Sequence, residues 1–470
     1  MGEPDQHGRL FGTDGVRGIA GHELTASLAL DLSVAAAAVL GRGAGDVLHC
    51  ASPGRGGDHG SGPAVAVVGR DPRISGEFLE AAVVAGLASA GVDVLRLGVI
   101  PTPGVAYLTR ALGAAFGVVI SASHNPARDN GIKFFGRGGV KLPDAVEDQI
   151  EAELSQGSRT PGASTPFGRV SDASAEQKRY LDHLLSTLPG DPGLALAGLR
   201  VVADCAHGAA YQIAPEALRR AGAEVIAIGA EPDGQNINAG CGSTSLDALA
   251  QAVVEHGADA GIAYDGDADR CLAVDADGHP LDGDQILAVL STELKEAGRL
   301  AHDAVVVTVM SNQGFHIAMR HAGIQVIETP VGDKHVSATM RDGGYVLGGE
   351  QSGHIILIEH ATTGDGILTS LQFLSAVNRR GLSLAAAAKM MRKYPQVLVN
   401  VPGDASRLGP RVAAAVSRAE SQLGGNGRVL VRPSGTEPKI RLMVQAVDAG
   451  LAEQVIGQLA DEVRLALAGQ

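Results

Sequence analysis

One stretch decides the fold, because in it an apolar run passes into a polar loop: Phe116-Gly117-Val118-Val119-Ile120-Ser121-Ala122-Ser123-His124-Asn125-Pro126. The apolar part is typical of a buried parallel strand, and residues just past the carboxyl end of such a strand line the ligand crevice of an open α/β sheet. Pro126 has a fixed φ and biases Asn125 towards extended geometry, so the loop should not continue at once into a helix. Ser123 is therefore a candidate nucleophile. Ordinary turn chemistry, with Ser and Asn side chains binding loose backbone donors, explains this segment alone about equally well.

Composition favours an α/β class with several domains. The 470 residues are 45% hydrophobic but only 3% aromatic, with no Trp, which suits helices packed on parallel strands. The length predicts three or four domains. A net charge of -14 disfavours nucleic acid or anionic lipid as the main partner, so an anionic substrate would need a locally basic pocket.

The sequence shows no sign of export or membrane insertion. No apolar run approaches membrane-spanning length, and the start, Met1-Gly2-Glu3-Pro4-Asp5, lacks the basic and apolar regions of a signal peptide. The cysteines lack C-x-x-C spacing, which fits reduced thiols rather than a disulfide framework or zinc site: Cys50, Cys205, Cys241 and Cys271. We expect a cytoplasmic protein with neither nucleic acid nor membrane as a partner.

Three joints share one pattern, in which a glycine ends an amphipathic helix and an apolar run follows: Ala90 to Leu95, Ala221 to Ile226 and Ala322 to Ile327. Glycine suits the left-handed position that ends a helix, and the apolar run suits a buried strand. The chain is therefore predicted to repeat one α/β unit three times.

The region from about Tyr394 has a different pattern. Strands are predicted at 397–401, 429–431 and 440–444, with helices around 411–423 and 451–467, which indicates a smaller α+β domain. The glycine-rich segment 41–63 is predicted to be a surface insertion. The predicted domains are 1–167, 168–280, 281–393 and 394–470.

Three carboxylates occupy alternate positions directly after the apolar stretch 260–264, in the loop Asp265-Gly266-Asp267-Ala268-Asp269-Arg270. On an extended segment they would share one face. Three negative charges so close together are unfavourable unless a cation or a proton neutralises part of the charge. Hard oxygen ligands suit Mg²⁺ better than Zn²⁺. The loop predicts a magnesium site, with a solvated acidic turn as the alternative.

A third strand-to-loop transition leads from Tyr345-Val346-Leu347 into Gly348-Gly349-Glu350-Gln351-Ser352-Gly353-His354. Glu350 can accept from two hydroxyls, Ser352 can donate or accept, and His354 can move protons near neutral pH. The pattern favours a sugar-binding loop, although by itself it is a weak signal.

A further loop follows the apolar run 429–431 and reads Arg432-Pro433-Ser434-Gly435-Thr436-Glu437-Pro438. Its glycine and hydroxyls permit a backbone nest around an oxyanion, and its arginine supplies charge. Lys439 and Arg441 add positive charge, which a plain Pro/Gly turn does not explain. The loop predicts a phosphate cradle.

Two other basic residues are candidates for the same crevice. Arg17 lies in the glycine-rich loop 11–18, before a helical stretch from Leu24 to Leu40, and Lys133 lies a short turn beyond Ser123. Read alone, Arg17 is better explained as a solvated loop arginine, and Lys133 has a surface lysine as its alternative reading.

Together these loops resemble those of the phosphohexomutases, over nearly the whole chain and in the family's order. The motifs are FGTDGVRG at 11–18, ISASHNP at 120–126, DGDADR at 265–270, EQSGH at 350–354 and RPSGTEP at 432–438. The metal loop often reads D-G-D-G-D-R in this family, and Ala268 replaces the middle glycine without removing a ligand. The intact loops argue against a non-catalytic sugar-phosphate-binding relative.

The resemblance implies four domains with mixed sheets around one central cleft. It implies a phosphoserine at Ser123 and one Mg²⁺ per subunit, with the metal ligands Ser123, Asp265, Asp267 and Asp269. It implies contacts to the sugar from Glu350, Gln351 and Ser352, and contacts to phosphate from Arg432, Ser434, Gly435, Thr436 and Arg441. Further catalytic roles fall on Arg17 beside the phosphoserine, Arg270 at the transferring group, and Lys133 and His354 in proton transfer.

The implied reaction interconverts glucosamine 6-phosphate and glucosamine 1-phosphate, and feeds UDP-N-acetylglucosamine and cell-wall synthesis. Glucosamine 1,6-bisphosphate or a similar sugar bisphosphate is the implied intermediate and activator. The alternative on the same scaffold is a phosphomannomutase or phosphoglucomutase. The expected partner is a hexosamine phosphate, and a homodimer is a candidate assembly.

Overall fold

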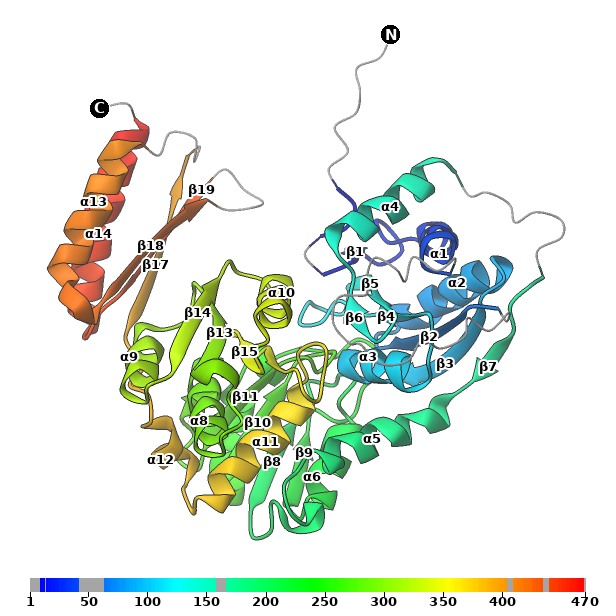
Figure 1. Cartoon of the computed structure of the whole chain (residues 1–470), viewed down its shortest axis with the longest axis horizontal. Coiled ribbons are helices and arrows are strands. Elements are labelled where there is room, and N and C mark those ends of the chain that lie inside the picture. The colour runs from blue at the N-terminus through cyan, green and yellow to red at the C-terminus, as the bar shows by residue number, and fades with distance from the viewer. Residues whose placement is uncertain are drawn as a thin grey trace.

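The computed structural model describes residues 9–12, 14–41, 63–157, 166–403, 409–433 and 439–468. These residues form four sheets, each with its own helices (Figure 1). Residues 42–62 of the predicted insertion lie outside the described ranges. None of the described helices is long and apolar enough to cross a membrane.

The N-terminal sheet carries the Ser123 loop. Its strands run in the order β1-β5-β4-β2-β3-β7 with β6 paired to β5; β2, β3, β4 and β7 are mutually parallel, and β1, β5 and β6 are antiparallel to their neighbours. The strands are β1 (Val16–Ile19), β2 (Val65–Arg70), β3 (Asp93–Val99), β4 (Phe116–Ile120), β5 (Asp129–Gly136), β6 (Val140–Lys141) and β7 (Val170–Asp172). The helices are α1 (Ala26–Leu40), α2 (Ser75–Ser89), α3 (Thr102–Ala111) and α4 (Asp144–Ser155).

Both faces of this sheet are covered. Val118 and Ile120 of β4 pack in the buried cluster that contains α1, α2 and α4, whereas Val119 packs in the cluster that contains α3. Successive side chains of a strand point to opposite faces, so a strand with two covered faces reads as a continuous apolar run. This explains the run that precedes Ser123.

The second sheet carries the metal loop. Its order is β12-β11-β10-β8-β9, with β9, β8 and β10 parallel and the rest antiparallel. The strands are β8 (Arg200–Asp204), β9 (Glu224–Ile228), β10 (Ala260–Tyr264), β11 (Cys271–Asp275) and β12 (Pro280–Leu281), and the helices are α5 (Gln177–Ser186), α6 (Ile213–Arg220) and α7 (Asp247–His256).

The third sheet carries the predicted sugar loop. Its order is β14-β13-β15-β16, with only the β15–β16 pair antiparallel. The strands are β13 (Ala304–Thr308), β14 (Gln325–Thr329), β15 (Leu347–Gly349) and β16 (Ile355–Leu357), and the helices are α8 (Gly283–Glu296), α9 (Gln313–His321), α10 (Asp333–Gly343), α11 (Gly366–Arg379) and α12 (Leu384–Ala388).

The three predicted joints are confirmed. Gly91, Gly222 and Gly323 have φ values of +83°, +100° and +67°, and each connects a helix to the next strand, namely α2 to β3, α6 to β9 and α9 to β14. The positive φ favours glycine because it has no Cβ. The expected class of three related α/β units with mixed sheets therefore holds.

The C-terminal sheet is antiparallel, in the order β17-β19-β18. Its elements are β17 (Gln396–Pro402), β18 (Arg428–Pro433), β19 (Lys439–Gln445), α13 (Pro410–Leu423) and α14 (Ala449–Leu467), close to the predicted ranges. The two helices cover the face turned away from the rest of the molecule (Figure 1). This part has a buried cluster of its own, whereas one continuous cluster runs through the first three units. A separate core is what a domain that can move as one unit requires.

The predicted division at 167/168 cuts the N-terminal sheet. β7 begins at Val170 and pairs with β3, so its backbone hydrogen bonds belong to the first sheet. We propose that the first domain extends to Asp172.

Candidate active site

Ser123 lies at the carboxyl end of β4 in an uncommon backbone conformation. Its φ is +51°, and its side chain is almost completely buried. Ser123 Oγ donates to Asp265 Oδ2 at 2.6 Å and lies 3.4 Å from His124 Nδ1. A left-handed non-glycine residue is costly and persists where the surroundings fix it, as at many functional sites.

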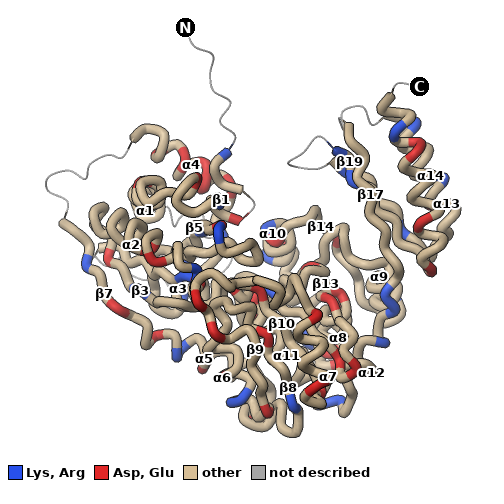
Figure 2. The backbone as a smooth tube through the Cα atoms, turned by 180° about the vertical axis from the view of Figure 1, so that it is seen from behind, with Lys and Arg blue, Asp and Glu red and all other residues tan. Residues whose placement is uncertain are grey.

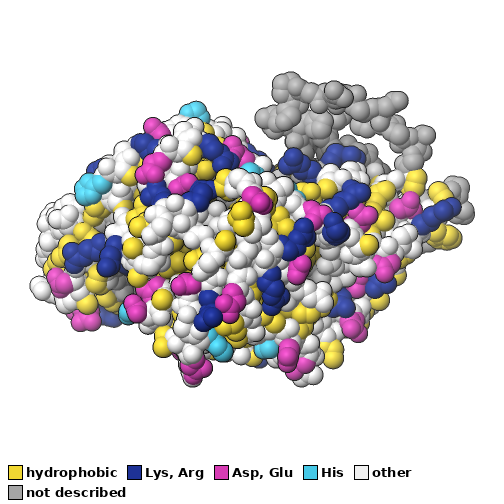
Figure 3. Space-filling view, turned by 90° about the horizontal axis from the view of Figure 1, so that it is seen from below, with side chains coloured by type: hydrophobic (Ala, Val, Ile, Leu, Met, Phe, Trp, Pro, Cys, Tyr) yellow, Lys and Arg dark blue, Asp and Glu magenta, His cyan; other side chains and the backbone are white. Residues whose placement is uncertain are grey.

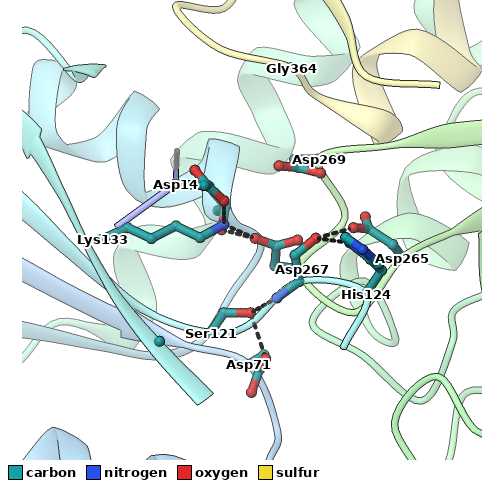
Figure 4. Close-up of polar contacts among 12 residues, drawn as sticks. Asp14, Asp71, Ser121, His124, Lys133, Asp265, Asp267, Asp269 and Gly364 are labelled. Carbon is teal, nitrogen blue, oxygen red and sulfur yellow. Dashed lines mark hydrogen bonds and ion pairs between the residues drawn. The ribbon is translucent and has the colours of Figure 1, made fainter. Parts of the chain in front are cut away.

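A chain of buried hydrogen bonds supports the backbone of this loop. The Ser123 amide donates to Ser121 Oγ at 2.9 Å, and Ser121 Oγ donates to Asp71 Oδ2 at 2.6 Å (Figure 4). Asp71 also pairs with Arg73 Nε at 2.8 Å. Sequence reasoning missed Asp71 and Arg73, because they follow a different strand, β2.

The metal loop is a tight turn, so the expectation of an extended segment is wrong. The Ala268 amide donates to the Asp265 carbonyl at 3.0 Å, and Ala268 has a φ of +58°. The chain turns back because β11 must pair antiparallel with β10. The carboxylates still converge, with one oxygen each of Asp265, Asp267 and Asp269 within 4.8 Å of the others (Figure 4).

This arrangement fits a divalent cation. The three carboxylates are buried, and Asp267 Oδ1 and Asp269 Oδ1 have no hydrogen-bond partner among the described residues. Burial, followed by the charges of Asp269 and Asp267, raises the pKa of Asp265 well above its usual value. The two buried carboxylate oxygens without hydrogen bonds are suitable ligands for an oxygen-seeking ion such as Mg²⁺.

Lys133 lies behind the metal loop. It projects from β5 and pairs with Asp267 Oδ2 at 2.8 Å and with Asp14 Oδ2 at 2.6 Å (Figure 4). Burial acts to lower the pKa of Lys133, but the charges of Asp14 and Asp267 raise it overall, well above the ordinary lysine value. The ammonium group therefore keeps its proton in this arrangement.

His354 joins the metal loop to the third sheet. Its backbone pairs with Arg270 in an antiparallel bridge, and its Nδ1 lies 3.4 Å from Asp269 Oδ2. The Gly364 amide donates to Nε2 at 3.1 Å, and a Cβ on Gly364 would lie 2.4 Å from that nitrogen. Only glycine permits this approach.

The protonation of His354 depends on its carboxylate neighbours. Burial acts to lower the pKa of His354, but Asp269 and Asp333 raise it to about 9. A doubly protonated ring cannot accept from the Gly364 amide, whereas a neutral ring protonated at Nδ1 can. The raised pKa and the contact from the Gly364 amide therefore favour different protonation states of this ring.

Charges of alternating sign connect the first and third α/β units. Asp14 contacts both Lys133 and Lys141, and Lys141 pairs with Asp333, which lies 3.4 Å from His354 Nε2. Burial acts to raise the pKa of Asp14, but the two lysines lower it well below its usual value. The chain from Asp14 to His354 therefore fixes side chains of the first and third units against each other.

A cleft with a volume of about 490 Å³ brings together part of the predicted site. It is lined by Arg9, Leu10, Gly12, Asp14, Gly15, Arg17, Ser123, His124, Asp269, Arg270, Val331, Gly332, Asp333, Glu350 and His354. Burial, then the charges of Arg270 and Arg17, lowers the pKa of His124 to about 4. The lining holds three arginines and four carboxylates, so the cleft is mixed in charge and not the basic pocket that the sequence led us to expect.

Within the sugar loop only Glu350 and His354 reach the cleft. Glu350 Oε1 accepts from the Gly332 amide at 3.1 Å, and Oε2 accepts from Ser352 Oγ at 3.3 Å. Gln351 Nε2 donates to Asp282 Oδ2 at 3.2 Å. Ser352 and Gln351 therefore hold the loop in place in this conformation.

The predicted phosphate cradle lies apart from the cleft. Arg432 and Arg441 are register partners on β18 and β19, at the basic end of the C-terminal sheet (Figure 2). Burial and then the charge of Arg441 lower the pKa of Arg432. Ser434, Gly435 and Thr436 lie outside the described residues. No described residue with a number above 354 lines the cleft, so no described residue of the C-terminal sheet reaches it.

Comparisons with known proteins identify the family. Four models, described as phosphoglucomutase/phosphomannomutase alpha/beta/alpha domains I, II and III and C-terminal domain, match residues 8–160, 178–278, 282–394 and 392–462. The chain is 62% identical to the phosphoglucosamine mutase of Thermobifida fusca, across 97% of this chain and 98% of that protein. It is 57% identical to the phosphoglucosamine mutase of Streptomyces griseus, across 98% and 100%. The chain belongs to the phosphoglucosamine mutase family. It is an isomerase of the phosphohexomutase type.

Solved structures share the fold of this phosphoglucosamine mutase family member. A phosphoglucomutase/phosphomannomutase family protein from Burkholderia thailandensis superposes with a TM-score of 0.78 at 21% identity, covering 97% of each chain. A putative phosphomannomutase from Thermus thermophilus superposes with a TM-score of 0.74 at 23% identity, covering 96% of this chain and 98% of that chain. N-acetylphosphoglucosamine mutase from Aspergillus fumigatus was solved in complex with GlcNAc-6P and magnesium. It superposes with a TM-score of 0.59 at 18% identity, covering 87% of this chain and 84% of that chain.

Several polar residues of this phosphoglucosamine mutase family site had no sequence signal of their own. Asp14 alone could have been found, since it lies in the glycine-rich loop beside Arg17. Lys141, Asp333 and Thr102, which donates to Asp267 Oδ2 at 2.7 Å, reach the site only through the packing of distant elements.

On the face shown in Figure 3, acidic and basic side chains are interspersed.

Proposed function

We propose that this enzyme interconverts glucosamine 6-phosphate and glucosamine 1-phosphate through a phosphoserine at Ser123 and glucosamine 1,6-bisphosphate. One observation carries the proposal: the Ser123 hydroxyl donates to Asp265, one of three converging buried carboxylates, and Ser123 lines a cleft that also presents Arg17, Arg270 and Glu350. The relatives with the highest identity given above are phosphoglucosamine mutases, which supports an amino-sugar substrate.

The proposed metal ligands are Ser123, Asp265, Asp267 and Asp269. Mg²⁺ bound there would supply positive charge to the oxygens of the transferring phosphoryl group. Thr102 and Lys133 both contact Asp267 Oδ2, which leaves Oδ1 of that carboxylate as the oxygen without a hydrogen bond in the described structure.

The cleft side chains define the proposed transfer step. A sugar hydroxyl oxygen bonds to phosphorus as the bond from phosphorus to Ser123 Oγ breaks, and the electron pair of that bond stays on Oγ. Arg17 and Arg270 line the cleft beside Ser123 and would balance the charge of the phosphoryl group. The hydroxyl proton passes to a base at the cleft wall.

His354 is better placed for that proton than Lys133. His354 lines the cleft, and a neutral ring protonated at Nδ1 could take the sugar proton on Nε2 in place of the hydrogen bond from the Gly364 amide. Lys133 is not among the lining residues and keeps its proton between Asp14 and Asp267. We propose that His354 acts in proton transfer and that Lys133 acts by orienting Asp267 and by its charge.

One serine must serve both ends of the sugar, so the bisphosphate has to turn over within the cleft. The phosphate that is not reacting then needs a second binding site. The paired Arg432 and Arg441, with the loop that contains Ser434 to Thr436, are the proposed site. It would act when the C-terminal part closes on the cleft.

The preference for an amino sugar rests on Glu350. Its carboxylate faces the cleft and can hold a protonated amine by a charge-assisted hydrogen bond, in competition with the Gly332 amide and Ser352. Since Glu350 can also hold hydroxyls, some activity on glucose phosphate is expected.

Two measurements test this proposal. The first compares kcat/KM for glucosamine, glucose and mannose monophosphates with one phosphorylated, Mg²⁺-loaded preparation. A preference for glucose or mannose phosphate would contradict the substrate and leave the chemistry standing. The second is intact mass: active enzyme that never carries a phosphoryl group on Ser123 contradicts the covalent route. Ser123→Ala should abolish turnover, whereas Ser155→Ala, on the exposed end of α4, should not.

A further inference from the structure

The peptide around His124 is held from two sides. Arg73 Nη2 donates to the carbonyl oxygens of Ser123 and Asn125 at 2.9 and 2.8 Å. Asn238 Nδ2 donates to the same two oxygens at 2.9 and 3.0 Å. Arg73 belongs to the first unit, in the turn between β2 and α2, and Asn238 belongs to the second, between β9 and α7. The two carbonyls that flank His124 are therefore fixed jointly by two domains.

The orientation of the Asn238 amide follows from its contacts. Two carbonyl oxygens can be neighbours only of the amide nitrogen, since an oxygen at that position would have no proton to offer. Asn238 Oδ1 then points elsewhere, and it is buried without a hydrogen-bond partner in the described part of the chain. A buried acceptor without a partner is costly, so the contacts of the nitrogen outweigh that loss.

Asn238 also borders the metal loop. A Cβ on Gly266 would lie 2.5 Å from the Ser123 carbonyl oxygen and 2.9 Å from Asn238 Nδ2. Gly266 stands next to Asp265, whose carboxylate receives the Ser123 hydroxyl at 2.6 Å. The Ser123 peptide is thus enclosed between Asn238 and the loop that presents the metal ligands.

Ser123 and Asn238, which holds its carbonyl oxygen, both have left-handed backbone. Ser123 has a φ of +51° and Asn238 a φ of +58°. Serine pays a steric cost there, whereas asparagine is among the residues that tolerate this region. Without the two donors the Ser123 peptide would be free to relax towards an ordinary conformation, and Oγ would then turn away from Asp265.

We propose that Asn238 is a positioning residue for phosphoryl transfer at Ser123. The inference rests on the proposed function, because it concerns the transfer step of that reaction. Asn238 does not line the cleft, so it acts through the Ser123 peptide and not by touching the sugar. Its loss should therefore slow phosphoryl transfer and leave sugar binding in place.

Two variants separate the amide donor from the backbone. Asn238→Gly removes the donor and keeps a residue that readily adopts positive φ, and Asn238→Asp keeps the side-chain shape but cannot donate. Asn236→Gly is the matched control. Asn236 lies in the same loop, and its amide contacts only Glu231 and Asp233 in the described structure.

The experiment follows one turnover. Enzyme phosphorylated on Ser123 and loaded with Mg²⁺ is mixed with glucosamine 6-phosphate in a quench-flow instrument, and loss of phosphoserine is measured over a range of sugar concentrations. Both Asn238 variants should lower the maximal transfer rate by about 10- to 100-fold, as expected for a misplaced reacting group. The half-saturating sugar concentration and the thermal unfolding midpoint should stay near wild type, and Asn236→Gly should match wild type throughout.

Three outcomes would overturn the inference. They are a transfer rate within about twofold of wild type in both variants, an equal change in rate and half-saturation, or failure of both variants to fold. A wild-type enzyme that transfers to glucose or mannose 6-phosphate but not to glucosamine 6-phosphate contradicts the proposed substrate instead. The Asn238 comparison then runs unchanged on the accepted sugar.

Discussion

Lys133 Nζ lies 2.8 Å from Asp267 Oδ2, and this pair ties β5 of the first unit to the metal loop of the second. The contact occupies one oxygen of the carboxylate and leaves Oδ1 buried without a partner in the described structure. The orientation of the Asp267 carboxylate is thus set partly by a residue of another domain. Such supporting contacts commonly govern metal affinity.

Asp267→Asn should weaken Mg²⁺ binding by at least about tenfold, because the site loses one of three charged oxygens. The readouts are the Mg²⁺ concentration for half-maximal activity and the Mg²⁺-dependent rise in thermal unfolding midpoint. Asp277→Asn is the control, since Asp277 belongs to a second, mostly exposed group with Asp275 and His279. Full wild-type activity in EDTA would contradict the metal site.

Ala268→Gly should stabilise the fold modestly. Ala268 has a φ of +58°, which costs roughly 1–2 kcal/mol for a residue with a Cβ, whereas glycine adds about 0.4–1 kcal/mol of unfolded-state entropy. The expected gain in the free energy of unfolding is up to about 1 kcal/mol by urea titration, with activity retained. Ala413→Gly on the exposed face of α13 should instead lose about 1 kcal/mol. Destabilisation by Ala268→Gly would show that the strain is compensated.

Asp365 should make stability fall with rising pH. It caps α11, accepts from Tyr180 Oη at 2.8 Å, and burial raises its pKa to about 6. Because the folded-state pKa is above the unfolded-state value, the contribution to stability is complete below about pH 4 and is lost as pH rises through about 6.

Urea unfolding at pH 4.5 and 6.5 tests this dependence. The wild-type free energy of unfolding should fall by about 2 kcal/mol more than that of Asp365→Asn over this interval. Asp448→Asn, at the exposed N-cap of α14, controls for the loss of a capping carboxylate. Parallel pH profiles of wild type and Asp365→Asn would show that the buried carboxyl does not titrate in this range.

Arg432→Ala should weaken binding of the sugar monophosphate by ~1.5–3 kcal/mol, because a charged phosphate contact is lost. Steady-state KM and direct titration of phosphorylated enzyme give the measurement. Arg418→Ala, on exposed α13 and paired only with Glu462 in the described structure, is the control. An unchanged affinity in Arg432→Ala would place the phosphate site elsewhere.

The sequence alone determined the local elements and the motif loops. The run 116–120 could be recognised as a buried strand because both of its faces are covered, and Gly91, Gly222 and Gly323 marked the helix-to-strand joints because left-handed backbone favours glycine. The loops at Ser123, Asp265 and Glu350 carry their chemistry in adjacent residues. Their residue types were therefore readable before their positions were known.

Only the tertiary structure decided how those loops meet. The metal loop had to be a turn, because β11 returns antiparallel to β10, and alternation along the sequence gives no information about that pairing. Lys141 and Asp333, 192 residues apart, form an ion pair only after two domains pack together. Asn238 reaches the Ser123 carbonyl across 115 residues in the same way. A sequence pattern reports the neighbours that share a strand or helix, whereas contacts between domains depend on packing that no local pattern encodes.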